Sequence, residues 1–158
     1  MTFPSRLVTR GRDRDEEQGF TLIELMVVVL IIAILIAIAI PTFLGARQRA
    51  QDRAAQSDLR NGLTAEKTFY TDSQTYATSA QMTTSNIETS LKWGTTPTVT
   101  LSADTLGVCL QEASKSGTIF SLMDISAGSA AGTYYGKIAC VTPPNSGTAV
   151  PAGFTSSW

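Results

Sequence analysis

The feature that most constrains the fold is an unbroken apolar run from Leu25 to Ile40. All sixteen of its residues are Leu, Met, Val, Ile or Ala. Counted from Phe20, the stretch is 21 residues long and holds one charged side chain, Glu24. A helix of this length measures roughly 31 Å, close to the ~30 Å hydrocarbon core of a bilayer. We therefore predict a membrane-spanning helix, rather than a buried core helix or the apolar region of a signal peptide.

The composition excludes much of enzyme chemistry. The chain has no His and only two Cys, which removes Ser–His–Asp and Cys–His catalysis and the zinc sites that need His or four Cys. Its formal net charge of −1 offers no clustered basic face for nucleic acid. We predict a protein that is not an enzyme, with no cofactor, no metal and no specific nucleic-acid site.

The helix is expected to continue beyond the apolar run. Residues after Pro41 are rich in Ala, Gln, Arg and Leu, which are good helix formers. Apolar side chains recur on one helical face, and this pattern predicts an amphipathic helix to about residue 72. The residues of that face are Ala55, Leu59 and Leu63 and, less regularly, Phe69 and Tyr70.

Pro41 and Gly45 lie where the apolar run ends. Proline lacks the N–H that a helix interior uses, and glycine has the freest backbone. These two residues predict a kink or local melting at the junction.

The second half of the chain has the pattern of a small sheet. The Thr- and Ser-rich segment 73–97 predicts a loop, and four later runs are rich in β-branched and aromatic residues. The tail 142–158 has three Pro, two Gly and no strand periodicity, so we expect it to lie on the surface. The predicted fold class is α+β, with a long N-terminal helix packed on a three- or four-stranded antiparallel sheet. The expected strands are 98–102, 106–113, 118–125 and 133–141.

The sequence around the start of the apolar run resembles the type IV prepilin family. A polar leader ends in Gly19, Phe20 follows, Glu24 stands four residues further on, and the apolar helix ends at Pro41. The motif itself covers residues 19–48. The long helix, the loop and the sheet extend the resemblance loosely over the chain, which is most similar in pattern to type IVa pilins. It implies a leader removed from 1–19, a transmembrane and polymerisation helix at 20–43, an amphipathic continuation at 44–72, a loop at 73–97, a sheet at 98–141 and a tail at 142–158.

The resemblance assigns roles to three residues. Prepilin peptidase would cut between Gly19 and Phe20 and methylate the new Phe20 amine, and a glycine lets backbone enter a protease groove closely. Glu24 would face the Phe20 amine of a neighbouring subunit. An ionisable residue costs about 2–3 kcal/mol toward the bilayer centre, so a role for Glu24 is the default expectation.

The same resemblance implies partners and location. The partners would be identical or related pilin subunits in a helical homopolymer, the peptidase/methyltransferase, an assembly platform with its ATPase, and membrane lipid before assembly. Arginines flank the apolar run on both sides, so the positive-inside rule does not orient it. The family implies a cytoplasmic leader, a single pass of the inner membrane and, after assembly, an extracellular filament.

Cys109 and Cys140 are candidates for a disulfide. They would lie outside the membrane, where such bonds persist, and the family often has a bridge near the C-terminus. A simple meander, however, would put the two cysteines on strands two apart, about 9–10 Å from each other and beyond bonding range. Either the strand order is not a meander or the thiols are free.

Three other functions compete with a pilus subunit. A pseudopilin of a type II secretion or competence system shares the N-terminal pattern, but the main secretion pseudopilin holds calcium with acidic C-terminal loop residues. Here no Asp or Glu follows Asp124. A membrane-anchored enzyme lacks a nucleophile–base pattern, and a non-assembling single-pass protein leaves Glu24 unexplained.

Overall fold

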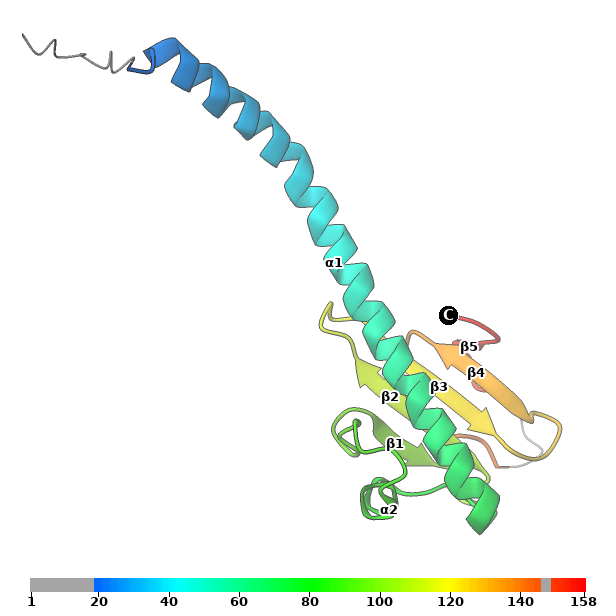
Figure 1. The fold of residues 1–158 in the computed structure, drawn as a ribbon. Coiled ribbons are helices and arrows are strands. Elements are labelled where there is room, and N and C mark those ends of the chain that lie inside the picture. The colour runs from blue at the N-terminus through cyan, green and yellow to red at the C-terminus, as the bar shows by residue number, and fades with distance from the viewer. Residues whose placement is uncertain (1–18, 146–148) are drawn as a thin grey trace, which may run out of the picture. The chain divides into compact units, whose positions relative to one another are not determined.

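The computed structural model describes residues 19–145 and 149–158, so the leader expected at 1–19 lies outside this part except for Gly19. The chain divides into two compact units, one ending at Pro41 and the other spanning Thr42–Trp158, and each is treated by itself. The order of elements along the chain is shown in Figure 1. The elements are α1 (Leu22–Ser73), α2 (Ser79–Ser85), β1 (Thr98–Leu101), β2 (Gly107–Ala113), β3 (Ile119–Ile125), β4 (Gly132–Gly136) and β5 (Phe154–Thr155).

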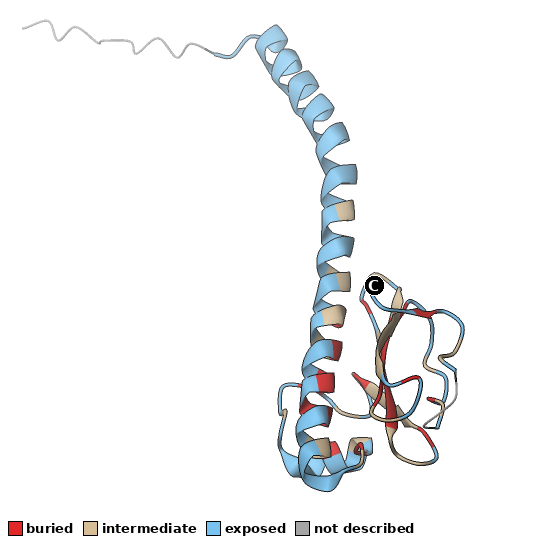
Figure 2. Ribbon diagram, turned by 90° about the vertical axis from the view of Figure 1, so that its right-hand side faces the viewer, coloured by how far each residue is buried: buried red, intermediate tan, exposed pale blue. Residues whose placement is uncertain are grey.

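The first unit consists of the apolar part of α1. Between Leu22 and Ile40 the large apolar side chains are 48–75% exposed on all sides of the helix (Figure 2). Within the described residues α1 is the one helix long and apolar enough, by length and composition, to cross a membrane. Pro41 and Gly45 both have helical backbone, so the chain is not melted at these positions. The kink expected there stays a prediction.

In the second unit, one face of α1 packs on the sheet. Ala55, Leu59 and Leu63 are 2%, 0% and 8% exposed, which confirms them as the buried face of the amphipathic helix. Gly62 lies close to the sheet, since a Cβ there would be 3.1 Å from Cδ1 of Leu110. The strand residues in this core are Val108, Leu110, Phe120 and Leu122.

The sheet is an antiparallel meander in the order β1-β2-β3-β4-β5. Its first four strands coincide with the four predicted runs, except that β4 ends at Gly136 rather than near residue 141. The α+β class and the antiparallel sheet are therefore confirmed. The fifth strand, Phe154–Thr155, pairs with β4 inside the segment expected to be a surface tail.

The tail covers the second face of the sheet. Cys109, Met123 and Ile125 point away from α1 and form a separate core with Phe154, packed against by Val150. Because both faces of β2 and β3 are covered, these strands are buried at successive residues rather than at alternate ones. The expectation of a surface tail needs correction at two residues: Pro143 and Phe154 are buried, whereas most of the described tail residues are exposed.

The loop expected at 73–97 contains the short helix α2. The Thr78 hydroxyl accepts the Gln81 N–H, and the Gln81 side chain accepts the Thr78 N–H, which is a reciprocal capping box. Met82 is fully buried against Ala65 and Ala77, with Phe69 packed beside them. Phe69 thus packs near α2 and not on the sheet as the helical spacing predicted. With only two apolar residues, Ala80 and Met82, SAQMTTS has too little periodicity to reveal a helix.

Cys109 and Cys140 form a disulfide with a Cα–Cα distance of 5.9 Å. The strand order is the meander that was expected to keep the two cysteines about 9–10 Å apart. That expectation was wrong because it also placed Cys140 in a strand, and Cys140 lies after the end of β4. Because β4 ends at Gly136, the chain is free to turn over the second face and bring Cys140 to β2. There the Cys140 N–H donates to Oε1 of Gln111 at 2.6 Å.

Candidate functional site

The junction between Gly19 and Phe20 lies just before α1. The Phe20 side chain is 91% exposed, and a Cβ added to Gly19 would meet no heavy atom of the described residues within 4 Å. Packing among the described residues therefore gives no reason for a glycine at this position.

Glu24 has a local role that the sequence analysis missed. Its Oε2 accepts the Thr21 N–H at 2.8 Å and the Thr21 hydroxyl at 2.7 Å, while the Glu24 N–H donates to Thr21 Oγ1 at 3.2 Å. This is the capping box of α1, and its signal, Thr followed three residues later by Glu, is present in the sequence. Glu24 can therefore order the first turn of the helix, whatever else it binds.

A buried carboxylate joins α1 to the sheet. Asp124, 4% exposed on β3, accepts hydrogen bonds from the hydroxyls of Tyr76 and Thr133 and forms an ion pair with Lys67 Nζ at 3.0 Å. Burial, and then the bond to Asp124, raise the pKa of Tyr76. Sequence reasoning missed this centre, although an Asp inside the apolar strand IFSLMDI was its available signal. These contacts serve to position α1 and do not resemble a reactive site.

A second buried acid lies on α1 itself. Glu66 is 0% exposed; its Oε2 accepts the Ala77 N–H at 2.9 Å, and its Oε1 has no hydrogen-bond partner within the described structure. Burial raises the pKa of Glu66 to about 7, and the Ala77 hydrogen bond opposes the shift. The carboxyl group thus ties α1 to the segment leading into α2.

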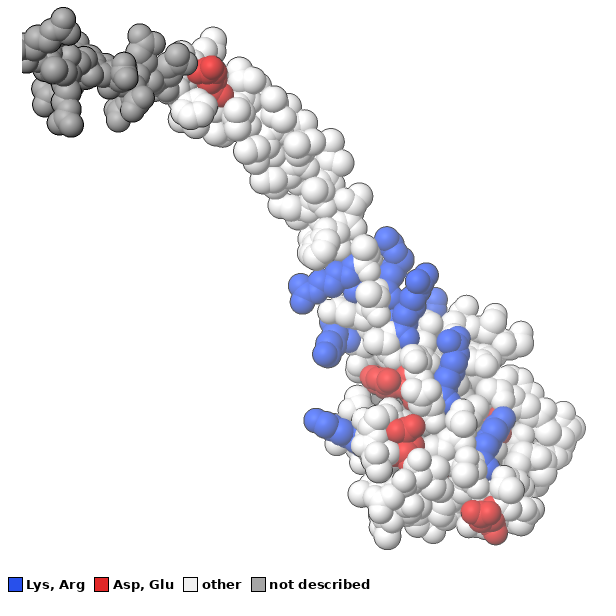
Figure 3. Space-filling view, in the orientation of Figure 1, with Lys and Arg blue, Asp and Glu red and all other residues white. Residues whose placement is uncertain are grey.

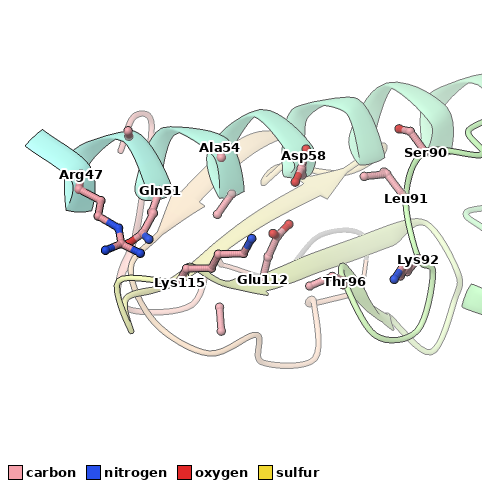
Figure 4. Close-up of a pocket in the computed structure, with 13 residues that line it drawn as sticks. Arg47, Gln51, Ala54, Asp58, Ser90, Leu91, Lys92, Thr96, Glu112 and Lys115 are labelled. Carbon is pink, nitrogen blue, oxygen red and sulfur yellow. The ribbon is translucent and has the colours of Figure 1, made fainter.

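A groove of about 640 Å³ lies between α1, the loop before β1 and the end of β2 (Figure 4). Asp58 and Glu112 are half-buried in it, while Arg47, Lys92 and Lys115 line it as exposed residues. Oε2 of Glu112 is buried and has no hydrogen-bond partner among the described residues. Burial, and then the charge of Asp58, raise the pKa of Glu112 to about 7.

Neither the groove nor the buried acids form a metal centre. Across 19–145 and 149–158, no three His, Cys, Asp or Glu residues gather closely enough to hold an ion. The features that stand out are an exposed apolar helix, a glycine–phenylalanine junction at its start, and a separate disulfide-linked α/β domain. Together they define a class: a protein with one candidate membrane helix that carries a small folded domain.

Comparison with known proteins makes this class more specific. Residues 14–40 match the family model described as the prokaryotic N-terminal methylation motif. A 67-residue stretch is 44% identical to the type IV major pilin protein PilA of Myxococcus xanthus (strain DK1622), covering 42% of this chain and 30% of that protein. No solved structure matches the chain significantly. Over the matched residues the chain is therefore similar to a type IV pilin, and its N-terminus matches the prepilin-type methylation motif.

Proposed function

We propose that this protein is a structural subunit of a type IV pilus. In this proposal prepilin peptidase cuts the chain between Gly19 and Phe20 and methylates the Phe20 amine. The platform and ATPase of an assembly machine then move the subunit from the inner membrane into an extracellular filament. The match to a major pilin over 67 residues supports a pilin-type subunit, and a pseudopilin of a secretion or competence system is the alternative.

The observation that carries the proposal is the complete exposure of an apolar helix. Apolar side chains are exposed around its whole circumference between Leu22 and Ile40. Burial of apolar surface is worth about 25 cal/mol per Å², so this surface has to be covered by lipid or by other helices. Exchange of lipid neighbours for helices of other copies turns a membrane anchor into the core of a polymer.

Glu24 gives the polymer its register. Cleavage creates an α-amine on Phe20, and methylation leaves that amine positive at neutral pH. An amine and a carboxylate of adjacent subunits, brought together in an apolar bundle, are screened weakly, and loss of one partner costs about 3–5 kcal/mol. The Thr21–Glu24 capping contacts hold the carboxylate at the helix start, beside the position where the amine appears.

The test is to find the protein in filaments. Cells that express the chain are sheared, and the filament and membrane fractions are compared by electron microscopy and peptide sequencing. We expect filaments that contain a chain beginning at methylated Phe20. Gly19→Leu should leave uncut precursor in the membrane. Normal cleavage of Gly19→Leu, or filaments that lack this chain, would contradict the proposal.

A further inference from the structure

The exposed side of α1 in the second unit has a straight row of cations. Arg49, Arg53, Arg60 and Lys67 follow one another at intervals of 4, 7 and 7 residues, and all four are exposed. At 3.6 residues per turn they stay within about 40° of each other over roughly 27 Å of helix. We name these four residues the basic row; Figure 3 shows blue side chains along this part of α1.

The three arginines of the basic row have no ion-pair partner in the described structure. Lys67 pairs with Asp124, but no carboxylate of the described residues lies within 4 Å of Arg49, Arg53 or Arg60. Asp58, five residues after Arg53, lies about 140° around the axis from it. Asp52 is nearer, about 60° around the axis from Arg49, but its Oδ1 accepts a hydrogen bond from the Ser116 hydroxyl. Their guanidinium groups are therefore available to another molecule.

The acidic counterpart lies on the other flank of the same helix. Asp58 and Glu112 lie together in the groove beside α1 (Figure 4), and Glu112 Oε2 is buried, with no hydrogen-bond partner in the part of the chain that the structure describes. The three cations that line the groove are exposed, and none of them forms an ion pair with either acid. A planar guanidinium that bonds two oxygens at once suits such a site better than a lysine does.

The charge balance of the domain favours a second copy as the partner. Thr42–Trp158 contains eight acidic and eight basic residues, so its net charge is zero. The basic row lies on one flank of α1 and the Asp58–Glu112 pair on the other, although the groove is also lined by three exposed cations. A contact that joins different surfaces of two identical subunits is heterologous, and it repeats as an open helical array when the rotation does not close. This is the symmetry that a filament has.

We propose, on the basis of the proposed function above, that the basic row of one subunit docks into the Asp58–Glu112 groove of a neighbouring subunit. An arginine of the row enters the groove and pairs with both carboxylates. This contact is separate from the Phe20–Glu24 pair, because it lies wholly in the second unit. It stabilises the filament between folded domains and depends on salt concentration, as contacts between partly exposed charges do.

Charge reversal in the full-length protein tests the contact. Glu112→Arg, and the matching reversal Arg49→Glu, Arg53→Glu or Arg60→Glu, should each leave cleavage and membrane levels unchanged. Glu112→Arg and the reversal of the arginine that enters the groove should lower the sheared-filament yield about tenfold or more. Joining Glu112→Arg with the reversal of that arginine should restore the yield. Lys137→Glu, a cation outside α1, is the matched control and should neither lower the yield nor rescue Glu112→Arg.

Two further variants keep the proposal open to refutation. Lys115→Gln should leave the yield unchanged; a loss equal to that of Glu112→Arg would mean that Glu112 pairs within its own chain. Glu112→Cys combined with Arg49→Cys, Arg53→Cys or Arg60→Cys should give a ladder of disulfide-linked subunits on brief oxidation of filaments. Absence of a ladder for all three pairs, or a link in Glu112→Cys alone, overturns the inference. If the wild-type chain forms filaments and every reversal variant gives the same yield, this contact is refuted and the pilus proposal still holds. If the wild-type chain forms no filaments, both proposals are refuted.

Discussion

Glu66 should make the stability of the second unit depend on pH. Burial raises its pKa from an ordinary value near 4.5 to about 7 in the folded protein. Below pH 4.5 the carboxyl group is protonated in both states, and between pH 4.5 and 7 it is ionised only in the unfolded chain. The free energy of unfolding should therefore fall as the pH rises through this window and level off above it.

The size of the effect follows from the shift. A difference of about 2.5 pKa units corresponds to roughly 3 kcal/mol, lost between pH 4.5 and pH 7. The pKa of Glu112 is also raised, but this residue is partly exposed, so solvent screens its contribution to the pH dependence of stability. Hydrogen bonds from Ser116 and then Ser114 lower the pKa of Asp52. Asp52 therefore makes the free energy of unfolding rise with pH, but at a lower pH than this window.

The matched variant is Glu66→Gln. Its amide oxygen can accept the Ala77 N–H as Glu66 does, but it carries no titratable group. Urea denaturation of residues 47–158 at a series of pH values compares the two proteins, since Thr42–Trp158 is a compact unit by itself. We expect the fall in stability to be about 3 kcal/mol smaller in the variant. Identical pH profiles for the two proteins would refute the assignment to Glu66.

Three other predictions concern stability and assembly. Replacing Cys109 and Cys140 by Ser opens a loop with a sequence separation of 31 residues and should lower the free energy of unfolding by about 3–4 kcal/mol, measured by urea denaturation with reduced wild type as the control. Leu63→Asp buries an unpaired charge and should abolish the thermal transition of residues 47–158, whereas Thr64→Asp, at an exposed neighbour, should preserve it; equal melting curves would show that Leu63 is not in the core. Glu24→Ala and Glu24→Gln should both give cleaved subunits in the membrane and few filaments, although glutamine can retain the capping contact; a wild-type filament yield from Glu24→Gln would show that the charge is not needed.

The sequence predicted the parts of the fold that rest on periodicity. Leu59 and Leu63 recur at helical spacing and are buried, and the β-branched runs became antiparallel strands. What it could not predict depends on contacts between distant residues. The tail contains no strand pattern because β5 is only two residues long, yet Phe154 packs on the second face of the sheet. The ion pair between exposed Lys67 and buried Asp124 joins α1 to β3, and its only local signal is an acid in an apolar strand.

The candidate site divides in a similar way. Gly19, Phe20 and Glu24 stand in a local motif, so the sequence could name them, and their roles in cleavage and assembly stay predictions. The Asp58–Glu112 groove needed the structure, because its two acids are more than fifty residues apart and meet only where α1 lies over β2. Nothing in the spacing of either residue indicates the other.

The disulfide has a mechanical consequence. It joins β2 to the segment after β4, so the interval from Cys109 to Cys140 cannot lengthen while the bond holds. If a chain anchored through α1 is pulled from beyond Cys140, only the residues outside this interval can be drawn out. At roughly 3.3–3.6 Å per extended residue, the bond withholds about 100–110 Å of extension. Under load the oxidised domain therefore extends less than the reduced one, and reduction of this single bond would release the additional length.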